Sequence, residues 1–178
     1  MRWIWWRSRL RLVLGQSTGR HPASLRFETG PHGKPFLRDN RELPFNLSHS
    51  GEVAVLGVSR SGEIGVDVEV PDPKFPALDV AREYFRPAEV AALDAAHDEA
   101  ERQARFFRLW TAKEAIMKAT GLGMALEPGQ IEVRLTADGW PVVYAAVDGF
   151  RATDWRLWCA EADGCVVSVA QHFPAAAG

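Results

Sequence analysis

Two carboxylates stand close together at the end of a short hydrophobic stretch, Ile64-Gly65-Val66-Asp67-Val68-Glu69. Side chains alternate between the two faces of a strand, so Asp67 and Glu69 are predicted to share one face and the valines the other. Such neighbours disfavour each other's ionised form unless a cation lies between them, and oxygen ligands suit magnesium. The pair therefore predicts a candidate metal site, although the exposed polar face of a sheet gives the same pattern.

A third carboxylate lies on the longest helical stretch, which is predicted to span residues 99–120. The spacing of four residues places Trp110, Glu114 and Lys118 along one stripe of that helix, while Leu109 and Ile116 face the core. This stripe is a further source of a carboxylate for chemistry. The alternative is an ordinary amphipathic helix, in which a Glu–Lys pair contributes about 0.2–0.5 kcal/mol.

Small polar side chains surround a histidine in the segment Asn46-Leu47-Ser48-His49-Ser50-Gly51. Such donors at a turn can bind a phosphate, and His49 adds a positive charge when it is protonated. A hydrolase nucleophile is not supported, because no Gly-x-Ser-x-Gly elbow surrounds Ser48 and neighbouring strand residues point to opposite faces.

The composition argues against several other functions. A chain of 178 residues with 47% hydrophobic residues can bury a proper core, and a formal net charge of −2 gives no global field for nucleic acid or an anionic membrane. The apolar run Trp3–Trp6 is too short for a signal peptide or a membrane span, so a cytoplasmic protein is predicted. Cys159 and Cys165 flank a predicted hairpin turn at 163–164 without facing each other, so neither a disulfide nor zinc is expected.

Helices and strands alternate along the chain in a way that indicates an α+β fold with two lobes. A helix is expected from about Arg7 to Gly15 or Gly19, with Leu10, Val13 and Leu14 buried. Three adjoining antiparallel strands, 45–47, 53–59 and 64–70, follow. Prolines 71, 73 and 76 mark the boundary between a lobe of residues 1–72 and one of residues 73–178. The second lobe is expected to contain helices 79–85, 87–96 and 99–120, strands 131–135, 141–146, 155–161 and 166–172, and turns at 138–139, 148–149 and 163–164.

Taken in order along the chain, these motifs resemble the Sfp-like (surfactin-synthetase-activating) class of 4'-phosphopantetheinyl transferases. The resemblance is carried by Gly33-Lys34-Pro35, Phe45–Ser50, Ile64–Glu69 and Trp110–Glu114 with Lys118. It implies two similar α+β lobes related by a pseudo-twofold axis, with coenzyme A and magnesium in the cleft between them. Asp67, Glu69 and Glu114 would be the metal ligands, two from one lobe and one from the other.

The same resemblance implies the residues that bind the nucleotide. Lys34 would lie by the adenosine end of coenzyme A, Ser48 and His49 would contact its 3'-phosphate, and Lys118 would contact the pyrophosphate. Arg7 and Ser8 match the start of a helix that reaches the nucleotide.

The implied reaction is attack by a carrier-protein serine on the β-phosphate of coenzyme A, which displaces adenosine 3',5'-bisphosphate. Magnesium and Lys118 would neutralise the phosphoryl oxygens, and Glu114, or a metal-bound water that it holds, is the first candidate for the general base. Glu89 matches another acidic position of the family and is the second candidate, with a simple acid in the first turn of a helix after Pro87 as the alternative.

The sequence departs from the family at its start, because members of this class carry several dozen more residues before the helix near Arg7. We therefore expect a shortened N-terminus. This leaves open a protein that binds coenzyme A or a carrier without transferring the arm, and a different metal-dependent phosphoryl enzyme with the same carboxylates. The expected partner is an apo acyl or peptidyl carrier protein of fatty-acid, polyketide or nonribosomal-peptide synthesis, bound transiently by a monomer, with no nucleic acid and no membrane.

Overall fold

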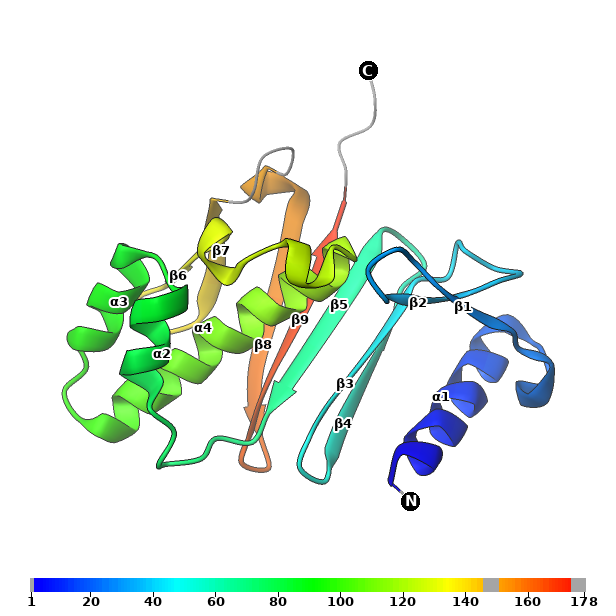
Figure 1. Ribbon diagram of the computed structural model, residues 1–178, viewed down its shortest axis with the longest axis horizontal. Helices are drawn as coiled ribbons and strands as arrows, with labels where there is room; N and C mark the ends of the chain where they lie inside the picture. The colour runs from blue at the N-terminus through cyan, green and yellow to red at the C-terminus, as the bar shows by residue number, and fades with distance from the viewer. Residues whose placement is uncertain (1, 146–150, 174–178) are drawn as a thin grey trace.

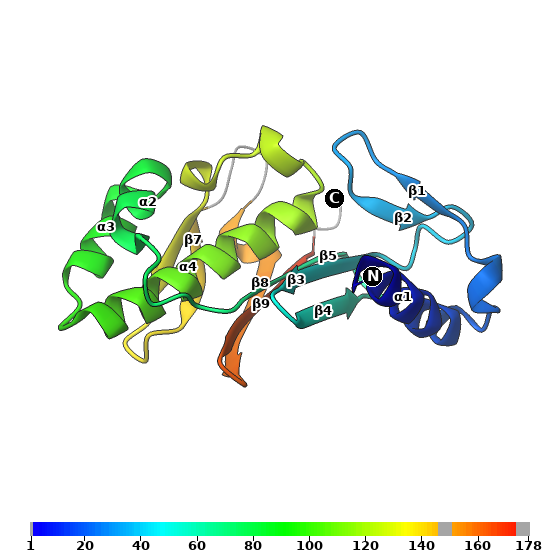
Figure 2. The same ribbon diagram turned by 60° about the horizontal axis from the view of Figure 1, so that its bottom comes forward.

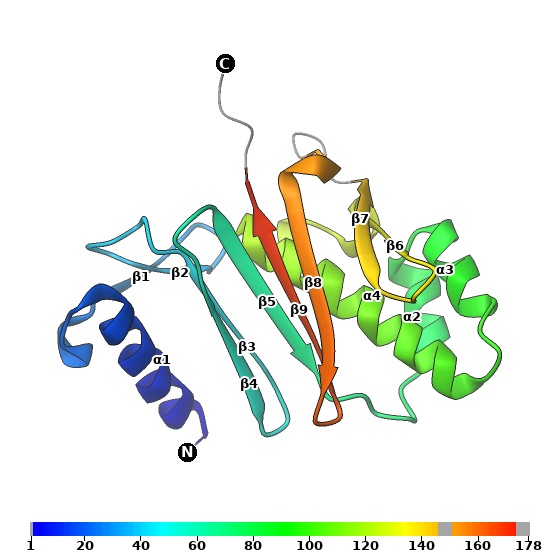
Figure 3. The ribbon, with the colours of Figure 1, turned by 180° about the vertical axis from the view of Figure 1, so that it is seen from behind.

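A long helix crosses one face of a three-stranded antiparallel sheet at the centre of the molecule (Figure 1). The computed structural model describes residues 2–145 and 151–173. The helix is α4 (Glu99–Thr120), and the sheet has the strand order β5 (Glu63–Glu69), β9 (Cys165–His172), β8 (Trp155–Ala162). Figure 3 shows the three strands from the side opposite to α4.

The ends of α4 are set by local signals in the sequence. Asp98 caps the first turn by accepting from the Glu101 backbone N–H at 2.8 Å, and Glu99 and Glu101 place negative charge at the positive end of the helix dipole. Gly121 ends the helix in the left-handed conformation, with φ of 71°. The predicted range 99–120 is confirmed.

The N-terminal part of the chain has its own small core. Leu14, at 0% exposure, packs with four other buried side chains, which are Leu25, Leu37, Leu43 and Phe45. The elements that carry or flank this core are α1 (Arg2–Thr18), a 3-10 helix (Pro22–Ser24), β1 (Phe27–Thr29), β2 (Pro35–Leu37), β3 (Phe45–Ser50) and β4 (Val53–Val58). The expectation that Val13 is buried with Leu14 was wrong, because Val13 is 39% exposed.

The pairing of the three predicted antiparallel strands is corrected in part. β3 and β4 pair antiparallel with Phe45 opposite Val58. β5 instead pairs antiparallel with β9, with Glu63 opposite His172 and Glu69 opposite Val166. β5 thus lies in a sheet with strands that come about a hundred residues later in the sequence.

The C-terminal part of the chain packs a larger core around α4. Three aromatic rings, Phe85, Phe106 and Trp110, stack on one another with centroids 5.3–6.2 Å apart. The remaining elements are α2 (Ala77–Tyr84), α3 (Pro87–Asp94), β6 (Glu132–Leu135), β7 (Pro141–Ala145) and 3-10 helices at Gly123–Ala125, Pro128–Gln130 and Ala152–Asp154. They lie close to the predicted ranges. The predicted turn at 148–149 lies outside the described residues.

The hairpin of β8 and β9 turns at Asp163 and Gly164, both of which have positive φ, as a tight two-residue loop requires. Ala162 lies opposite Cys165, and Cys159 lies opposite Ser168, as predicted. Both cysteines are free.

The mixture of helices and antiparallel sheets confirms the predicted α+β class. Figure 2 shows α1, β1 and β2 at one end of the molecule, α2 and α3 at the other, and β3 and β4 between them beside β5. β5 connects the two ends of the molecule. It directly follows β3 and β4 in the sequence, and it pairs with β9 from the C-terminal part of the chain. The division of the chain at residues 72 and 73 stays a prediction. Across 2–145 and 151–173, none of the helices combines the length and apolarity that crossing a membrane requires.

Gly65 permits the close approach of α4 to β5. A Cβ atom at this position would lie 2.0 Å from the Ala115 carbonyl oxygen and 2.4 Å from the Ala119 backbone nitrogen. Atoms of a helix backbone cannot move aside as the end of a side chain can. Any side chain at residue 65 would therefore push α4 away from the strand.

We expect Gly65→Ala to lower the free energy of unfolding by about 3 kcal/mol, because the helix and strand must separate to admit the methyl group. Urea denaturation of the variant and the wild type measures the difference. Gly30→Ala is the matched control, since a Cβ there would meet only the Lys34 carbonyl oxygen at an ordinary 3.6 Å. Equal effects of the two substitutions would contradict this account of the packing.

Candidate active site

Asp67 and Glu69 lie on the face of β5 that α4 covers. The strand alternates, with Val66 and Val68 fully buried on the other face and Gly65 directly under α4. Asp67 is 2% exposed, and Glu69 is partly exposed at the end of the strand. The two predicted neighbours therefore present their carboxylates toward the helix that carries the third one.

β3 supplies the hydrogen bonds of this pair. Ser48 Oγ donates to Asp67 Oδ1 at 2.8 Å, and Ser50 Oγ donates to Glu69 Oε2 at 2.8 Å. The Val66 N–H donates to Asn46 Oδ1 at 2.8 Å. Alternate side chains of β3 thus bond to successive positions along β5, and the two strands run in the same direction. These side-chain hydrogen bonds take the place of the backbone hydrogen bonds that would pair two strands in one sheet. His49, between the serines, is exposed on the opposite face of β3.

α4 adds a cation and the third carboxylate. Lys118 Nζ lies 2.5 Å from Asp67 Oδ1, 3.2 Å from Ser48 Oγ and 3.9 Å from Glu114 Oε2. The helical spacing of Glu114 and Lys118 places both side chains over β5. The structure therefore brings together four residues predicted from the sequence, which are Asp67, Glu69, Glu114 and Lys118.

Burial makes these carboxylates hard to ionise. Desolvation raises the pKa of Asp67, while the Lys118 ammonium and the Ser48 hydroxyl oppose that rise. Desolvation also raises the pKa of Glu69 and of Glu114, and repulsion from Asp67 adds to both shifts. The three acids thus share a site in which negative charge is costly unless positive charge is added.

A hard cation suits this donor set. Asp67 Oδ2 is buried and accepts no hydrogen bond from any described residue. Such an orphaned carboxylate oxygen, flanked by two further carboxylates, offers the oxygen ligands that magnesium takes. Within the part of the chain that the structure describes, no three acidic, His or Cys side chains are already gathered as a metal site. The Lys118 ammonium provides the positive charge beside Asp67 instead.

A hollow of about 210 Å³ opens beside Lys118. It lies between the turn at 32–35, the start of β3 and the end of α4, and its lining includes His32, Lys34, Asn46 and Gly121. Lys34 Nζ donates to Glu63 Oε2 at 2.7 Å, to the Ala119 carbonyl oxygen at 2.8 Å and to the Ile64 carbonyl oxygen at 3.2 Å. The predicted nucleotide residue Lys34 thus connects the turn to β5 and to the last turn of α4.

Arg7 and Ser8 lie on the exposed side of α1, whose contacts include β4 and the 3-10 helix at 22–24. The described contacts of the four gathered residues do not include either of them. Their predicted part in binding the nucleotide stays a prediction.

Glu89, the second candidate for the general base, forms a buried ion pair with Lys113. Glu89 Oε1 lies 2.7 Å from Lys113 Nζ, and the two side chains are 0% and 1% exposed. Glu89 also accepts from the Arg86 and Val133 backbone N–H groups at 2.7 Å each. All these contacts lie within the core of the C-terminal part of the chain, and none joins Glu89 to the other acids.

Lys113 has a structural role that was not predicted, although its position in the sequence indicated burial. Lys113 is four residues after Leu109 and three before Ile116, the two positions expected to face the core. A lysine on the apolar face of a helix needs a buried partner. Lys113 Nζ also donates to the Pro128 and Ile131 carbonyl oxygens at 2.9 and 2.5 Å, which fixes α4 against the segment before β6.

Comparison with known families shows which family the chain belongs to. Residues 63–172, from β5 to the end of β9, match the model of the 4'-phosphopantetheinyl transferase superfamily. The chain belongs to this superfamily. The predicted fold of these transferases is thereby confirmed, while the Sfp-like class and the pseudo-twofold axis stay predictions.

Several named transferases are similar to this chain. The 4'-phosphopantetheinyl transferase HetI of Nostoc is 39% identical over 90% of this chain and 66% of its own length. The 4'-phosphopantetheinyl transferase Sfp of Bacillus subtilis is 33% identical over 73% of this chain and 56% of its own. A holo-(acyl-carrier-protein) synthase from Bacillus anthracis, in complex with CoA (3',5'-ADP), aligns at 22% identity and a TM-score of 0.49, over 62% of this chain and 96% of that one. The chain spans about half to two thirds of the length of the curated relatives it matches.

We expect Glu89→Gln in this transferase family member to lower the free energy of unfolding by about 3–5 kcal/mol, because Lys113 is left as an uncompensated buried charge. Urea denaturation measures the change. Asp94→Asn is the control: its ion pair with Arg82 spans 3.9 Å between side chains that are more than half exposed, so its loss should cost no more than about 1 kcal/mol. If Glu89→Gln were as mild as the control, the pair would not hold α4 in place.

The raised pKa values of Asp67, Glu69 and Glu114 predict a pH dependence of stability. A carboxylate whose pKa is higher in the folded chain stabilises the fold below its unfolded pKa of about 4, and this contribution is lost as pH rises through the folded pKa. In the presence of a chelator, the free energy of unfolding should therefore fall less between about pH 4.5 and 7 in Asp67→Asn/Glu69→Gln/Glu114→Gln than in the wild type. An identical pH dependence of the two proteins would show that these acids do not titrate as described.

Proposed function

We propose that this chain transfers the 4'-phosphopantetheine group of coenzyme A to a serine of an apo acyl or peptidyl carrier protein, releasing adenosine 3',5'-bisphosphate. The observation that carries the proposal is the junction of β3, β5 and α4, where Lys118 lies among Asp67, Glu69 and Glu114. Membership of the 4'-phosphopantetheinyl transferase superfamily supports the same reaction.

Phosphoryl transfer needs positive charge where the phosphoryl oxygens gather negative charge. Lys118, which pairs with Asp67, borders the hollow of about 210 Å³, and Lys34 lies in the same lining. A pyrophosphate in this hollow would be held next to the Lys118 ammonium. Lys118 is thus proposed to bind the pyrophosphate and to stabilise the charge that develops as the bond to the leaving phosphate breaks.

The residues that would hold magnesium are Asp67, Glu69 and Glu114. When bound, the metal would neutralise charge on the pyrophosphate and acidify its bound water. The buried Oδ2 of Asp67, which accepts no hydrogen bond within the described residues, supports this assignment. Ser48 and Ser50 orient Asp67 and Glu69 through one hydrogen bond each.

Glu114 is the proposed acceptor of the serine proton, directly or through a water. Its pKa is raised by burial and by the two neighbouring acids, and a general base works best when its pKa is close to the operating pH. Glu89 suits this role less well, because its carboxylate already accepts from two backbone N–H groups and pairs with Lys113.

The remaining assignments concern the nucleotide and the setting. Lys34 is proposed at the adenosine end and the exposed His49 at the 3'-phosphate, with Arg7 and Ser8 as further contacts from α1. The Ser48 side chain, expected at the same phosphate, lies on the other face of β3 and donates to Asp67, so it is proposed to orient that carboxylate instead. The motifs favour the Sfp-like class. A monomer in the cytoplasm that meets its carrier protein transiently is the proposed working form.

The proposal is tested by incubating the protein with an apo carrier protein, coenzyme A and magnesium, and weighing the carrier by mass spectrometry. The expected result is a mass increase of the carrier equal to one phosphopantetheine group. A reaction mixture that contains a chelator from the start should give no increase. No increase, with an established transferase succeeding in parallel, would refute the proposal. Binding of coenzyme A in that case would favour a binding protein without turnover.

We expect Glu114→Gln to lower the rate of transfer roughly a hundredfold or more while the fold is kept, because the substitution preserves size and removes the carboxylate. Initial rates with wild type and variant, with circular dichroism as the check on folding, measure the effect. Glu83→Gln, at an exposed position of α2, is the matched control and should keep the wild-type rate. Transfer at the normal rate by Glu114→Gln would contradict the role given to Glu114.

A further inference from the structure

Lys34 joins two walls of the hollow of about 210 Å³. One wall is the turn at residues 32–35, and another is the end of α4, with Lys118 and Gly121. The Lys34 ammonium donates to the Ala119 carbonyl oxygen at 2.8 Å, in the last turn of that helix. The two walls are therefore held together by a side chain that belongs to one of them.

The N–H groups of this ammonium are all occupied. A lysine ammonium has three of them. Their acceptors are Glu63 Oε2 at 2.7 Å, the Ala119 carbonyl oxygen at 2.8 Å and the Ile64 carbonyl oxygen at 3.2 Å. The Lys34 side chain is only 16% exposed. A ligand in the hollow could accept from Lys34 only by displacing one of these three acceptors.

The bond to Ala119 satisfies a need of the helix end. The last four carbonyl groups of a helix lack partners within the helix, and the helix dipole places negative charge there. Ala119 is one residue before Thr120, the last residue of α4. Lys34 supplies both the missing donor and a positive charge. The bond thus stabilises the turn of α4 that carries Lys118.

Two glycines after α4 allow the walls to meet. Gly121 and Gly123 have positive φ, of 71° and 55°. A Cβ atom at Gly121 would lie 3.2 Å from Lys34 Cδ, and one at Gly123 would lie 3.1 Å from the His32 carbonyl oxygen. The stem of Lys34 and the turn therefore pack directly on the segment that follows the helix. This contact and the three bonds of the ammonium fix the separation of the two walls.

We infer that Lys34 is a positioning residue, which sets the width of the hollow and holds the last turn of α4 without donating to the nucleotide. The inference rests on the proposed function for the occupant of the hollow, the adenosine end of coenzyme A. Lys34 keeps its predicted place beside the nucleotide, but it acts through the residues that it holds.

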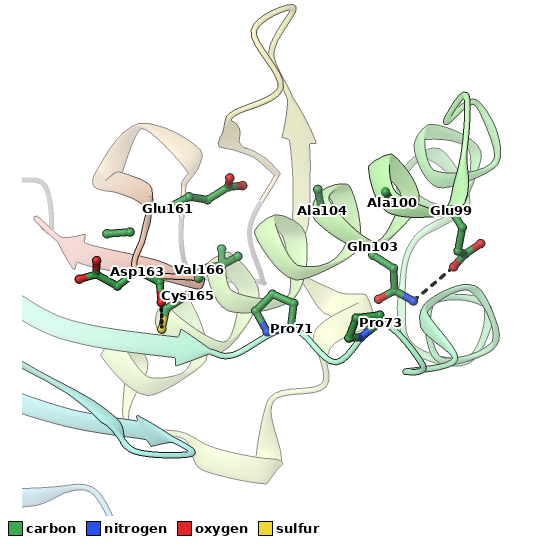
Figure 4. Close-up of a pocket in the computed structure, with 12 residues that line it drawn as sticks. Pro71, Pro73, Glu99, Ala100, Gln103, Ala104, Glu161, Asp163, Cys165 and Val166 are labelled. Carbon is green, nitrogen blue, oxygen red and sulfur yellow. Dashed lines mark hydrogen bonds between the residues drawn. The ribbon is translucent and has the colours of Figure 1, made fainter.

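Hydrogen exchange of the free protein tests the role of these bonds. Lys34→Met keeps the stem and removes all three bonds, so the backbone amides of residues 30–34 and 121–126 should exchange about tenfold or more faster than in the wild type. Lys74→Met is the matched control, because Lys74 is exposed and follows Pro73, which lines a separate pocket beyond the other end of β5 (Figure 4). Equal exchange in Lys34→Met and the wild type would overturn the inference, whether or not the protein is a transferase.

Steady-state kinetics separate positioning from a general loss of structure. In Lys34→Met we expect the KM for coenzyme A to rise about tenfold and kcat to change by less than about threefold, because Asp67 still holds Lys118. The KM for the carrier protein should stay the same. A fall in kcat as large as the rise in KM would contradict a role confined to the hollow.

Glu63→Gln distinguishes positioning from direct contact. Glu63 is 53% exposed and occupies one N–H of Lys34. If the ammonium bound the nucleotide, the loss of this acceptor would free a donor and tighten the binding of adenosine 3',5'-bisphosphate. Positioning predicts an affinity within about twofold of the wild type. Calorimetry at about 0.15 M salt, which screens the change in surface charge, measures the difference.

Binding that is threefold or more tighter in Glu63→Gln would refute the inference in favour of direct contact. A wild type that binds no adenosine 3',5'-bisphosphate would remove the occupant of the hollow and overturn the inference as well. Binding without transfer of the phosphopantetheine group would count against the proposed function alone.

Discussion

The close contact between α4 and β5 at Gly65 is the constraint on which the rest of the structure depends. Because residue 65 has no side chain, the backbone of α4 near Ala115 and Ala119 can lie directly on the strand. The next two side chains on that face of β5, Asp67 and Glu69, then come within reach of Glu114 and Lys118 from the helix. The buried pair of Glu89 and Lys113 fixes the same helix from its other side. A site made of groups from distant parts of the sequence is thus positioned by one contact between two backbones.

Charge balance explains the character of the site. Three carboxylates share a partly buried junction, and among the described residues the ammonium group paired with them is that of Lys118. Burial favours the protonated form of the acids, whereas an added cation would favour the ionised form. The same ammonium is the group proposed to meet the pyrophosphate, so the carboxylates and the phosphates would compete for it unless a metal satisfied the acids. The donor set and the proposed substrate would therefore both be stabilised by a cation bound to these carboxylates.

Sequence patterns predicted those parts of the structure that local interactions determine. The ends of α4 follow from Asp98 and Gly121, the turn of β8 and β9 from Asp163-Gly164, and the shared face of Asp67 and Glu69 from alternation. The partner of β5 could not be read from the sequence, because pairing with β9 depends on tertiary packing between segments about a hundred residues apart. Likewise, the burial of Lys113 and the exposure of Val13 depend on which elements cover each helix. The bonds of Lys34 to β5 and α4 also required the assembled fold.

The pairing of β5 with a strand from the C-terminal part of the chain has a consequence for folding. β5 belongs by sequence to the first segment and by hydrogen bonding to the sheet of the second. Without it, β9 would be an edge strand with unpaired backbone groups, which is a template for aggregation. The sheet closes only after a loop of about a hundred residues has been formed, a high contact order that slows folding. A chain cut between Pro71 and Pro76 should therefore yield two fragments that are each unstable alone and that recover a native sheet only by associating.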